Sequence, residues 1–276
     1  MKGYAVIEKK IGETPLSALE AFRKTSSELE GVPLTYAGRL DPMASGKLLI
    51  LIGEECKRRK IYDGLDKEYE FEVLFGFKSD TGDVLGLAES CVGAEQYAEK
   101  TMRAMAKSFV GVHTFVYPAF SSKVVSGKPL FHHAIENNLE AIEIPTTDVR
   151  IYKMRFCAMR RSSSEELIEH ILGKIDLLQL AEPDSRTGSG FRKEEIIARW
   201  KTLRTSDLKQ YTIAKFRATV SSGTYIRALA PRLAEKLGTC GLAYSIQRTK
   251  IGRFFPVTKS FGFWRKNFLK NRKKAD

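Results

Sequence analysis

The sequence predicts a mixed α+β fold, in which short strands and amphipathic helices alternate along the chain. Two patterns support this: runs with an apolar period of two recur along the chain, and stripes of apolar residues at helical spacing lie between them. The chain has 276 residues, of which 43% are hydrophobic and 29% charged. This length and composition are typical of a folded chain with a sizeable core and exclude a disordered one.

Six segments read as strands. The clearest is Tyr69–Phe77, where Tyr69, Phe71, Val73, Phe75 and Phe77 occupy alternate positions. In chain order the predicted strands are Tyr4–Glu8, Lys47–Ile52, Tyr69–Phe77, Asp148–Cys157, Ile213–Val220 and Leu242–Arg248. Because these short strands alternate with helical segments, we expect a mixed α+β domain.

Three segments outside residues 160–209 are predicted to be helices. Ser17–Thr25 follows the first strand. Glu95–Val110 carries Met102, Met105, Ala106 and Phe109 on one stripe. Tyr225–Leu237 is followed by Gly238, and glycine commonly ends a helix.

Between residues 160 and 209 the strand signals stop. Two groups of apolar residues at helical spacing flank a loop-like stretch at 183–190. We predict a domain over residues 1–258 that contains a helical insertion at 160–209. A basic tail follows at 259–276, and its part from Arg265 onward supplies five units of the net charge.

The charge of the chain points to an anionic partner. Lys and Arg total 46 and Asp and Glu total 33, so the formal net charge is +13. Nucleic acid is the first candidate and an acidic membrane surface the second. No apolar run is long enough to span a membrane, and the N-terminus carries no export signal.

The four cysteines are far apart in the sequence: Cys56, Cys91, Cys157 and Cys240. There is no CxxC pair and no histidine at ligand spacing, which argues against a zinc site or a disulfide framework. We therefore expect reduced thiols in a cytoplasmic protein.

The densest run of unusual residues spans 36–46. Glycines at 38 and 46 and a proline at 42 predict a tightly shaped loop that leads into a buried strand and holds Asp41. Carboxylates on such loops are common catalytic groups, but a plain turn capped by an aspartate has the same pattern. Spacing alone favours the turn.

The segment Gly38–Gly46 resembles the GxLDPxAxG motif of the TruB family of tRNA pseudouridine synthases, in which the aspartate is catalytic. Five further segments resemble the family's motifs in the same order: Val6–Thr14, Lys67–Tyr69, Ser79–Asp83, Pro118–Lys128 and Ser222–Arg227. Six motifs in register make chance similarity a poor explanation.

The resemblance implies the pseudouridine synthase fold, with a mixed, largely antiparallel sheet flanked by helices. It also assigns the site. Asp41, Tyr69 and Arg227 take the catalytic positions: the carboxylate, an aromatic that stacks on the base and removes its C5 proton, and a cation beside the carboxylate. The implied substrate-binding residues are Tyr36, Arg39, Lys9, Lys123, Ile246 and Arg248. The reaction changes no oxidation state, so it implies no cofactor, and the sequence shows no metal-ligand set.

Two departures from the family pattern stand out. Bacterial members usually have a histidine five residues before the aspartate, where this chain has Tyr36. Many relatives also end in a PUA domain, and the 20 residues after Pro256 are too few to build one. We expect the insertion at 160–209 and the basic tail to grip tRNA instead.

The implied activity is isomerisation of the T-loop uridine (tRNA position 55) to pseudouridine. The implied partner is the T-arm of tRNA, with no membrane, no obligate protein partner and a monomeric chain. One alternative is a ribosomal-RNA pseudouridine synthase, which Arg39 would suit and Pro42 argues against. Another is a non-catalytic RNA-binding protein or tRNA-folding chaperone on the same fold.

Overall fold

A central sheet organises the chain. The computed structural model describes residues 3–91, 97–178, 192–204, 210–258 and 261–265. Seven strands follow the order β1-β3-β12-β4-β11-β10-β7, and β2 pairs with β3 as the eighth. Their bounds are β1 Tyr4–Lys9, β2 Leu34–Ala37, β3 Ala44–Ile52, β4 Asp66–Phe75, β7 Gly111–Val116, β10 Thr146–Ser163, β11 Gln210–Val220 and β12 Gly241–Gly252.

The sheet is mixed and mostly antiparallel. β3 and β12 run parallel, and the other neighbouring pairs among the described strands are antiparallel. The predicted α+β class, with a largely antiparallel mixed sheet flanked by helices, is therefore confirmed. Three two-stranded ribbons lie outside the sheet: β5 Phe77–Ser79 with β6 Ala88–Ser90, β8 Val124–Val125 with β9 Lys128–Pro129, and β13 Phe254–Pro256 with β14 Gly262–Trp264.

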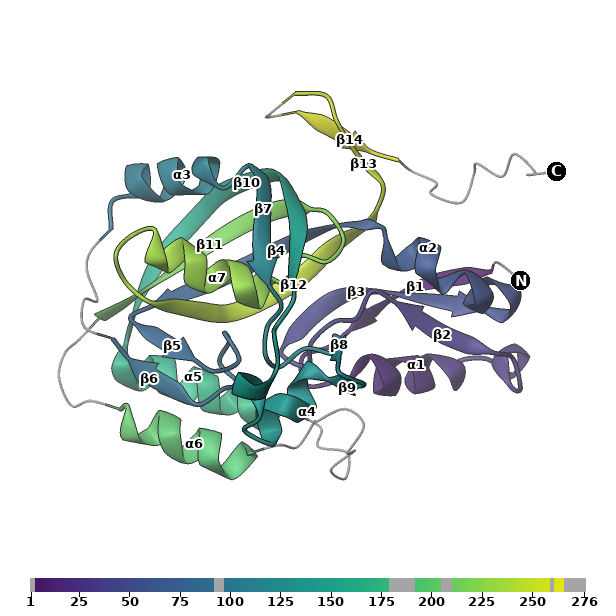
Figure 1. Cartoon of the computed structure of the whole chain (residues 1–276), viewed down its shortest axis with the longest axis horizontal. Coiled ribbons are helices and arrows are strands. Elements are labelled where there is room, and N and C mark those ends of the chain that lie inside the picture. The colour runs from purple at the N-terminus through teal and green to yellow at the C-terminus, as the bar shows by residue number, and fades with distance from the viewer. Residues whose placement is uncertain (1–2, 92–96, 179–191, 205–209, 259–260, 266–276) are drawn as a thin grey trace.

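Helices pack against the sheet and the ribbons. They are α1 Pro15–Arg23, α2 Arg59–Asp63, α3 Glu99–Ser108, α4 Leu130–Ile135, α5 Ser164–Asp176, α6 Lys193–Thr202 and α7 Ile226–Glu235, with 3₁₀ turns at Ser27–Leu29, Gly53–Arg58 and Leu139–Ala141. In Figure 1, α7 crosses in front of the sheet, and it packs on β12 and β4. Among the described residues, none of these helices has the length and apolarity to cross a membrane.

The alternation of β4 separates two faces of the sheet. Phe71 and Val73 are buried in the main core, and Lys67 and Tyr69 share their parity and hence their face. The glutamates at 68, 70 and 72 occupy the opposite face. Directly across from them are Thr219, Arg217 and Lys215 of β11. We call these two sides the inner face and the outer face.

The segment predicted as a helical insertion contains α5 and α6. β10 continues to Ser163, so the helical part begins four residues after 160. Trp200 of α6 is fully buried, lies against Phe77, and donates to the carbonyl of Val84 at 3.0 Å. This anchors α6 to the β5–β6 ribbon. The predicted loop at 183–190 lies outside the described residues.

Some elements escaped the sequence patterns. β2, β7 and the β13–β14 ribbon were not predicted, because short strands with mixed polarity carry little periodic signal. β14 falls within the stretch 259–276 that the sequence assigns to a basic tail, so part of that stretch is a paired strand.

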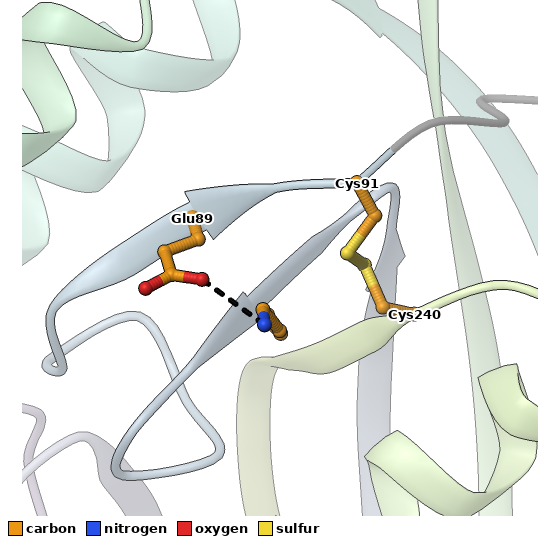
Figure 2. Close-up of a disulfide and its surroundings, with 4 residues drawn as sticks. Glu89, Cys91 and Cys240 are labelled. Carbon is orange, nitrogen blue, oxygen red and sulfur yellow. Dashed lines mark ion pairs between the residues drawn. A yellow bond between two sulfur atoms is a disulfide. The ribbon is translucent and has the colours of Figure 1, made fainter.

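The expectation of four reduced cysteines is wrong for two of them. Cys91, just after β6, and Cys240, just before β12, form a disulfide with their Cα atoms 6.3 Å apart (Figure 2). The backbone of Gly76 accepts from the N–H of Cys91 and donates to the carbonyl of Cys240. Sequence spacing could not show this, because 149 residues separate the two cysteines. Cys56 and Cys157 are free.

Candidate active site

A pocket of about 380 Å³ opens on the inner face of the sheet. Its walls come from the loop between β2 and β3, from β4 and β12, from the turn between β5 and β6, and from the starts of α6 and α7. Six cations line it, namely Arg39, Lys67, Arg192, Lys193, Arg227 and Arg248, against the three carboxylates Asp41, Asp63 and Asp83. The excess of positive charge suits an anionic ligand.

The loop that carries Asp41 is fixed from behind by Arg248. This arginine is 1% exposed, and its guanidinium donates to the carbonyls of Gly38, Arg39 and Lys47 at 2.7–3.2 Å. At Gly46, φ is +105° and a Cβ would lie 2.3 Å from the carbonyl oxygen of Arg248. Glycine at this position lets β3 approach β12 closely enough for these bonds to form.

Arg227 holds the Asp41 carboxylate in two places. Its Nε donates to Oδ2 at 2.8 Å, and one terminal nitrogen donates to Oδ1 at 3.1 Å. The terminal nitrogens also donate to the carbonyls of Thr81 and Phe120, both at 2.9 Å. The side chain of Arg227 is 5% exposed and that of Asp41 is 34% exposed. The pair therefore presents a carboxylate to the pocket while its cation stays buried.

A second carboxylate, Asp83, lies behind Arg227. Its Oδ2 is 3.4 Å from the arginine Nε, and its Oδ1 accepts from the hydroxyl of Thr81 at 2.7 Å. Burial raises the pKa of Asp83 to about 6, against the opposing effects of Arg227 and Thr81. Burial alone would lower the pKa of Arg227, but the charges of Asp41 and Asp83 raise it above its ordinary value.

Tyr69 and Ile246 lie on neighbouring strands of the pocket wall. Tyr69 of β4 is 7% exposed and Ile246 of β12 is 4% exposed. They stand two pairs apart in the β4–β12 register, since Tyr69 faces Arg248 and Ile246 faces Phe71. Tyr36 lines the pocket from β2, with the Arg59 guanidinium 5.5 Å from its ring centre.

Of the other predicted binding residues, Arg39 lines the pocket, whereas Lys9 and Lys123 do not. Arg39 is exposed at the pocket rim. Lys9 is 1% exposed and lies outside the pocket lining, where its ammonium donates to the carbonyls of Ala44 and Lys10. Lys123 is exposed and also lies outside the lining, with its ammonium 5.1 Å from the ring centre of Tyr117.

Lys67 lines the pocket, but no role was assigned to it from the sequence. Within the segment Lys67–Tyr69, a function was assigned only to Tyr69. Lys67 is 6% exposed, and its ammonium donates to the carbonyl of Asp63 at 2.9 Å. Burial lowers its pKa to about 8, and the charge of Arg248 acts in the same direction. Lys67 and Arg248 are therefore two buried cations whose side chains both lie next to Gly38.

Asp83 was missed in the same way. The motif at 79–83 was noticed as a turn, and the available signal was its combination of hydroxyl and carboxylate residues. Gly82 explains the local shape: its φ is +73°, and a Cβ there would lie 2.4 Å from the carbonyl oxygen of Arg227. The close approach of this turn to α7 sets the carboxylate behind the arginine.

The arrangement suits chemistry at a carboxylate. Asp41 offers a partly exposed carboxylate next to a buried cation, in a pocket whose lining includes Tyr36 and Tyr69. Among the described residues, no group of three or more His, Cys, Asp or Glu side chains converges as metal ligands.

Comparisons with known proteins agree with one another. Residues 30–172 match the family model described as TruB family pseudouridylate synthase (N terminal domain). The chain is 29% identical over 265 residues to tRNA pseudouridine synthase B of Nitrosospira multiformis, covering 92% of this chain and 65% of that protein. It is 30% identical over 234 residues to the protein of that name from Thermus thermophilus, covering 85% and 67%. The chain therefore spans about two thirds of the length of these relatives.

A more distant relative and a solved structure extend the comparison. The chain is 25% identical over 260 residues to tRNA pseudouridine synthase 4 of Saccharomyces cerevisiae, covering 84% of this chain and 64% of that protein. It also superposes on a chain in the crystal structure of a Cbf5-Nop10-Gar1 complex. The TM-score is 0.53 at 14% identity, over 91% of this chain and 49% of that one. This likeness concerns the fold alone.

Proposed function

The chain belongs to the TruB family of pseudouridylate synthases, a family of isomerases, and from this premise we propose that it converts the T-loop uridine of tRNA to pseudouridine. The observation that carries the proposal is the Asp41 carboxylate held at both oxygens by Arg227 inside a positively charged pocket. The names of the relatives support tRNA as the substrate.

The reaction exchanges one bond for another at the same sugar carbon. The N1–C1′ bond of uridine breaks, the base turns, and C5 bonds to C1′. C5 then loses its proton, while N1 gains one, so the product has the same atoms as the substrate. The target base has to leave its stack to reach the site, and the pocket provides space for a flipped nucleotide.

Each catalytic residue has a role in this proposal. Asp41 attacks or stabilises the reacting nucleotide as the N1–C1′ bond breaks. Arg227 holds both oxygens of Asp41, so the carboxylate is oriented before the substrate arrives. Tyr69 stacks on the flipped base and takes the C5 proton. Ile246 contacts the other side of the base, and Tyr36 fills the space that the base vacates.

The cations have positioning and binding roles. Arg39 at the pocket rim meets the RNA backbone, and Arg248 keeps the Asp41 loop in place. Lys9 supports the same loop through its bond to Ala44, and Lys123 contacts RNA outside the pocket. No cofactor is required, because the reaction changes no oxidation state.

We also propose a monomer that acts on the tRNA T-arm in the cytoplasm without an obligate protein partner. The Cys91–Cys240 disulfide weighs against the cytoplasmic location, since such bonds are typical of oxidising compartments.

The experiment uses tRNA transcripts that carry tritium at C5 of uridine, because pseudouridine formation releases that atom. The protein should release tritium from a tRNA transcript and not from one whose T-loop uridine is replaced by cytidine. Asp41→Asn keeps the volume of the side chain and removes its charge, so release should fall to background while tRNA affinity changes no more than a few-fold. Asp148→Asn, the same change at an exposed site outside the pocket, is the control and should remain active.

Other outcomes would reassign the protein. Near-normal release by Asp41→Asn would overturn the role of this carboxylate. Release from ribosomal RNA but not from tRNA would favour the ribosomal-RNA alternative. Tight tRNA binding without any release would favour the non-catalytic RNA-binding protein.

A further inference from the structure

The β13–β14 ribbon carries exposed aromatic rings. Among the described residues, the phenylalanines, tyrosines and tryptophans in the exposed class are Phe255, Phe261 and Phe263, at 41%, 60% and 55% exposure. All three belong to this ribbon or to the connection between its strands. In Figure 1 the ribbon, drawn in yellow, projects from the upper edge of the molecule.

One side of the ribbon is anchored and the other is open. On the anchored side, Phe254 is 6% exposed and packs against Trp264 and Tyr152. Its N–H donates to the carboxylate of Asp66 at 2.8 Å. The neighbouring cross-strand pair, Phe255 and Phe263, points to the other side of the ribbon because side chains alternate along a strand.

The open side carries two rings that stack on each other. The rings of Phe255 and Phe263 are 5.5 Å apart between centres and only 19° from parallel. Exposing two large aromatic rings to water is unfavourable, so a pair held in this way indicates a surface that a ligand covers. The free faces of these rings suit a planar group that can stack on them.

The charge around the ribbon selects an anionic partner. The ammonium of Lys153 lies 5.3 Å and 5.6 Å from the ring centres of Phe254 and Phe261. The ammonium of Lys250, which also pairs with Glu68, lies 5.8 Å from the ring centre of Trp264. Arg253 and Arg265 lie at the base of the ribbon, where the N–H of Arg265 donates to the carbonyl of Arg253 at 3.0 Å. Exposed rings interleaved with cations are the pattern of surfaces that bind unpaired nucleic acid.

We propose that the outward ring pair of the β13–β14 ribbon is a second RNA-binding site, which stacks on unpaired bases outside the catalytic pocket. β12 joins the two places, since it carries Arg248 in the pocket and leads into Phe254 six residues later. At about 3.3 Å per residue, this is roughly 20 Å along the strand. One RNA molecule seated in the pocket can therefore reach the ribbon. The choice of RNA as the anion rests on the proposed function.

The test measures binding rather than turnover, so it is independent of the catalytic assignment. Phe255→Ala combined with Phe263→Ala should weaken binding of a tRNA transcript by roughly tenfold, because the bases lose the rings on which they stack. Phe255→Leu with Phe263→Leu keeps the surface apolar, loses the aromatic faces, and should weaken binding nearly as much. The control is Val112→Ala with Val116→Ala, which removes exposed apolar surface from the edge strand β7 and should bind normally.

Tryptophan emission gives a second measurement. The ring of Trp264 packs on Phe254, on the anchored side, so the reporter protein combines Phe263→Trp with Trp264→Phe, which places a tryptophan on the open side. Single-stranded oligouridylate should quench the emission of this protein. The result also decides the matter if the alanine variant fails to fold.

Three results would overturn the proposal. The first is unchanged tRNA affinity in the folded leucine variant, and the second is absence of quenching by oligouridylate. The third is quenching by phosphatidylserine vesicles but not by RNA, which would assign the ribbon to an acidic membrane surface. Loss of uridine isomerisation with intact ribbon binding would instead count against the proposed function and leave this site standing.

Discussion

Two arginines on opposite faces of the same sheet pair with carboxylates in different surroundings. On the inner face, Arg227 is 5% exposed and holds Asp41, Asp83 and two backbone carbonyls. On the outer face, Arg217 is 38% exposed and pairs with Glu70, which Lys215 also contacts. Hydrogen bonds from Lys215 and Arg217 lower the pKa of Glu70, although partial burial opposes them.

The difference lies in the cation of each pair. Arg227 is buried and Arg217 is open to water, although the side chain of Glu70, at 14% exposure, is less exposed than that of Asp41, at 34%. On the outer face, water competes for the charges, and such pairs contribute little to stability. On the inner face, the donors of Arg227 are committed to fixed acceptors, so the orientation of Asp41 is set by the fold. The same substitution made on both faces tests this contrast.

Arg227→Ala should have the largest effect. It leaves two carboxylates of the site without their cation, so activity should fall near background and the free energy of unfolding should drop by about 3–5 kcal/mol. Arg217→Ala, its match on the outer face, should keep full activity and lose no more than about 1 kcal/mol. Denaturant unfolding and tritium release measure the two quantities. If both variants lost the same free energy of unfolding, the burial of Arg227 would not distinguish it from Arg217.

The disulfide should have the next largest effect, because it ties the β5–β6 ribbon to the start of β12. The turn of that ribbon supplies Thr81 and Asp83 to Arg227. Cys91→Ser should lower the free energy of unfolding by about 2–4 kcal/mol, since the bond closes a loop of 149 residues. Cys157→Ser, at an exposed free thiol, is the control and should leave stability unchanged.

The measurement is thermal unfolding with and without dithiothreitol. The reductant should lower the Tm of the unmodified protein and leave that of Cys91→Ser where it is. If dithiothreitol changes the Tm of neither protein, Cys91 and Cys240 are not joined in solution. Activity should also decrease in Cys91→Ser, because the turn that fixes Arg227 is less constrained.

The sequence predicted the parts of the molecule whose signal is local. Alternation placed the inner-face residues of β4, and helical spacing located α3, α5, α6 and α7 to within a few residues. The pairing of Asp41 with Arg227 bridges 186 positions in the sequence, so no periodicity could reveal it. Only the resemblance to a family brought these two residues together.

The parts that were missed depend on tertiary contact. Asp83 acquires its place because Gly82 lets a turn touch the backbone of α7. The Cys91–Cys240 bond exists because the β5–β6 ribbon folds back beside the start of β12. The β13–β14 ribbon is held by Asp66 and Tyr152, which lie far from it in the sequence. Each of these is a meeting of distant segments, and composition and spacing do not encode it.

The smallest expected effect is a dependence of stability on pH, from a lysine on the inner face. Burial lowers the pKa of Lys67 to about 8, from an ordinary value of 10.5. Between pH 8 and 10.5 the unfolded chain therefore binds more protons at this residue than the folded one, so stability rises with pH across that window. One pKa unit corresponds to about 1.4 kcal/mol, which bounds the contribution of Lys67 at roughly 3 kcal/mol.

Lys67→Met removes this contribution and should flatten the rise. Part of the rise remains, because burial also lowers the pKa values of Lys9 and Lys174 to about 8. Lys215→Met is the control, because it makes the same change to an outer-face lysine whose side chain is 42% exposed. The measurement is urea unfolding at several pH values from about 7 to about 10.5. If the Lys67→Met and Lys215→Met variants show the same slope of unfolding free energy against pH, burial on the inner face does not lower the pKa of Lys67 in the folded protein.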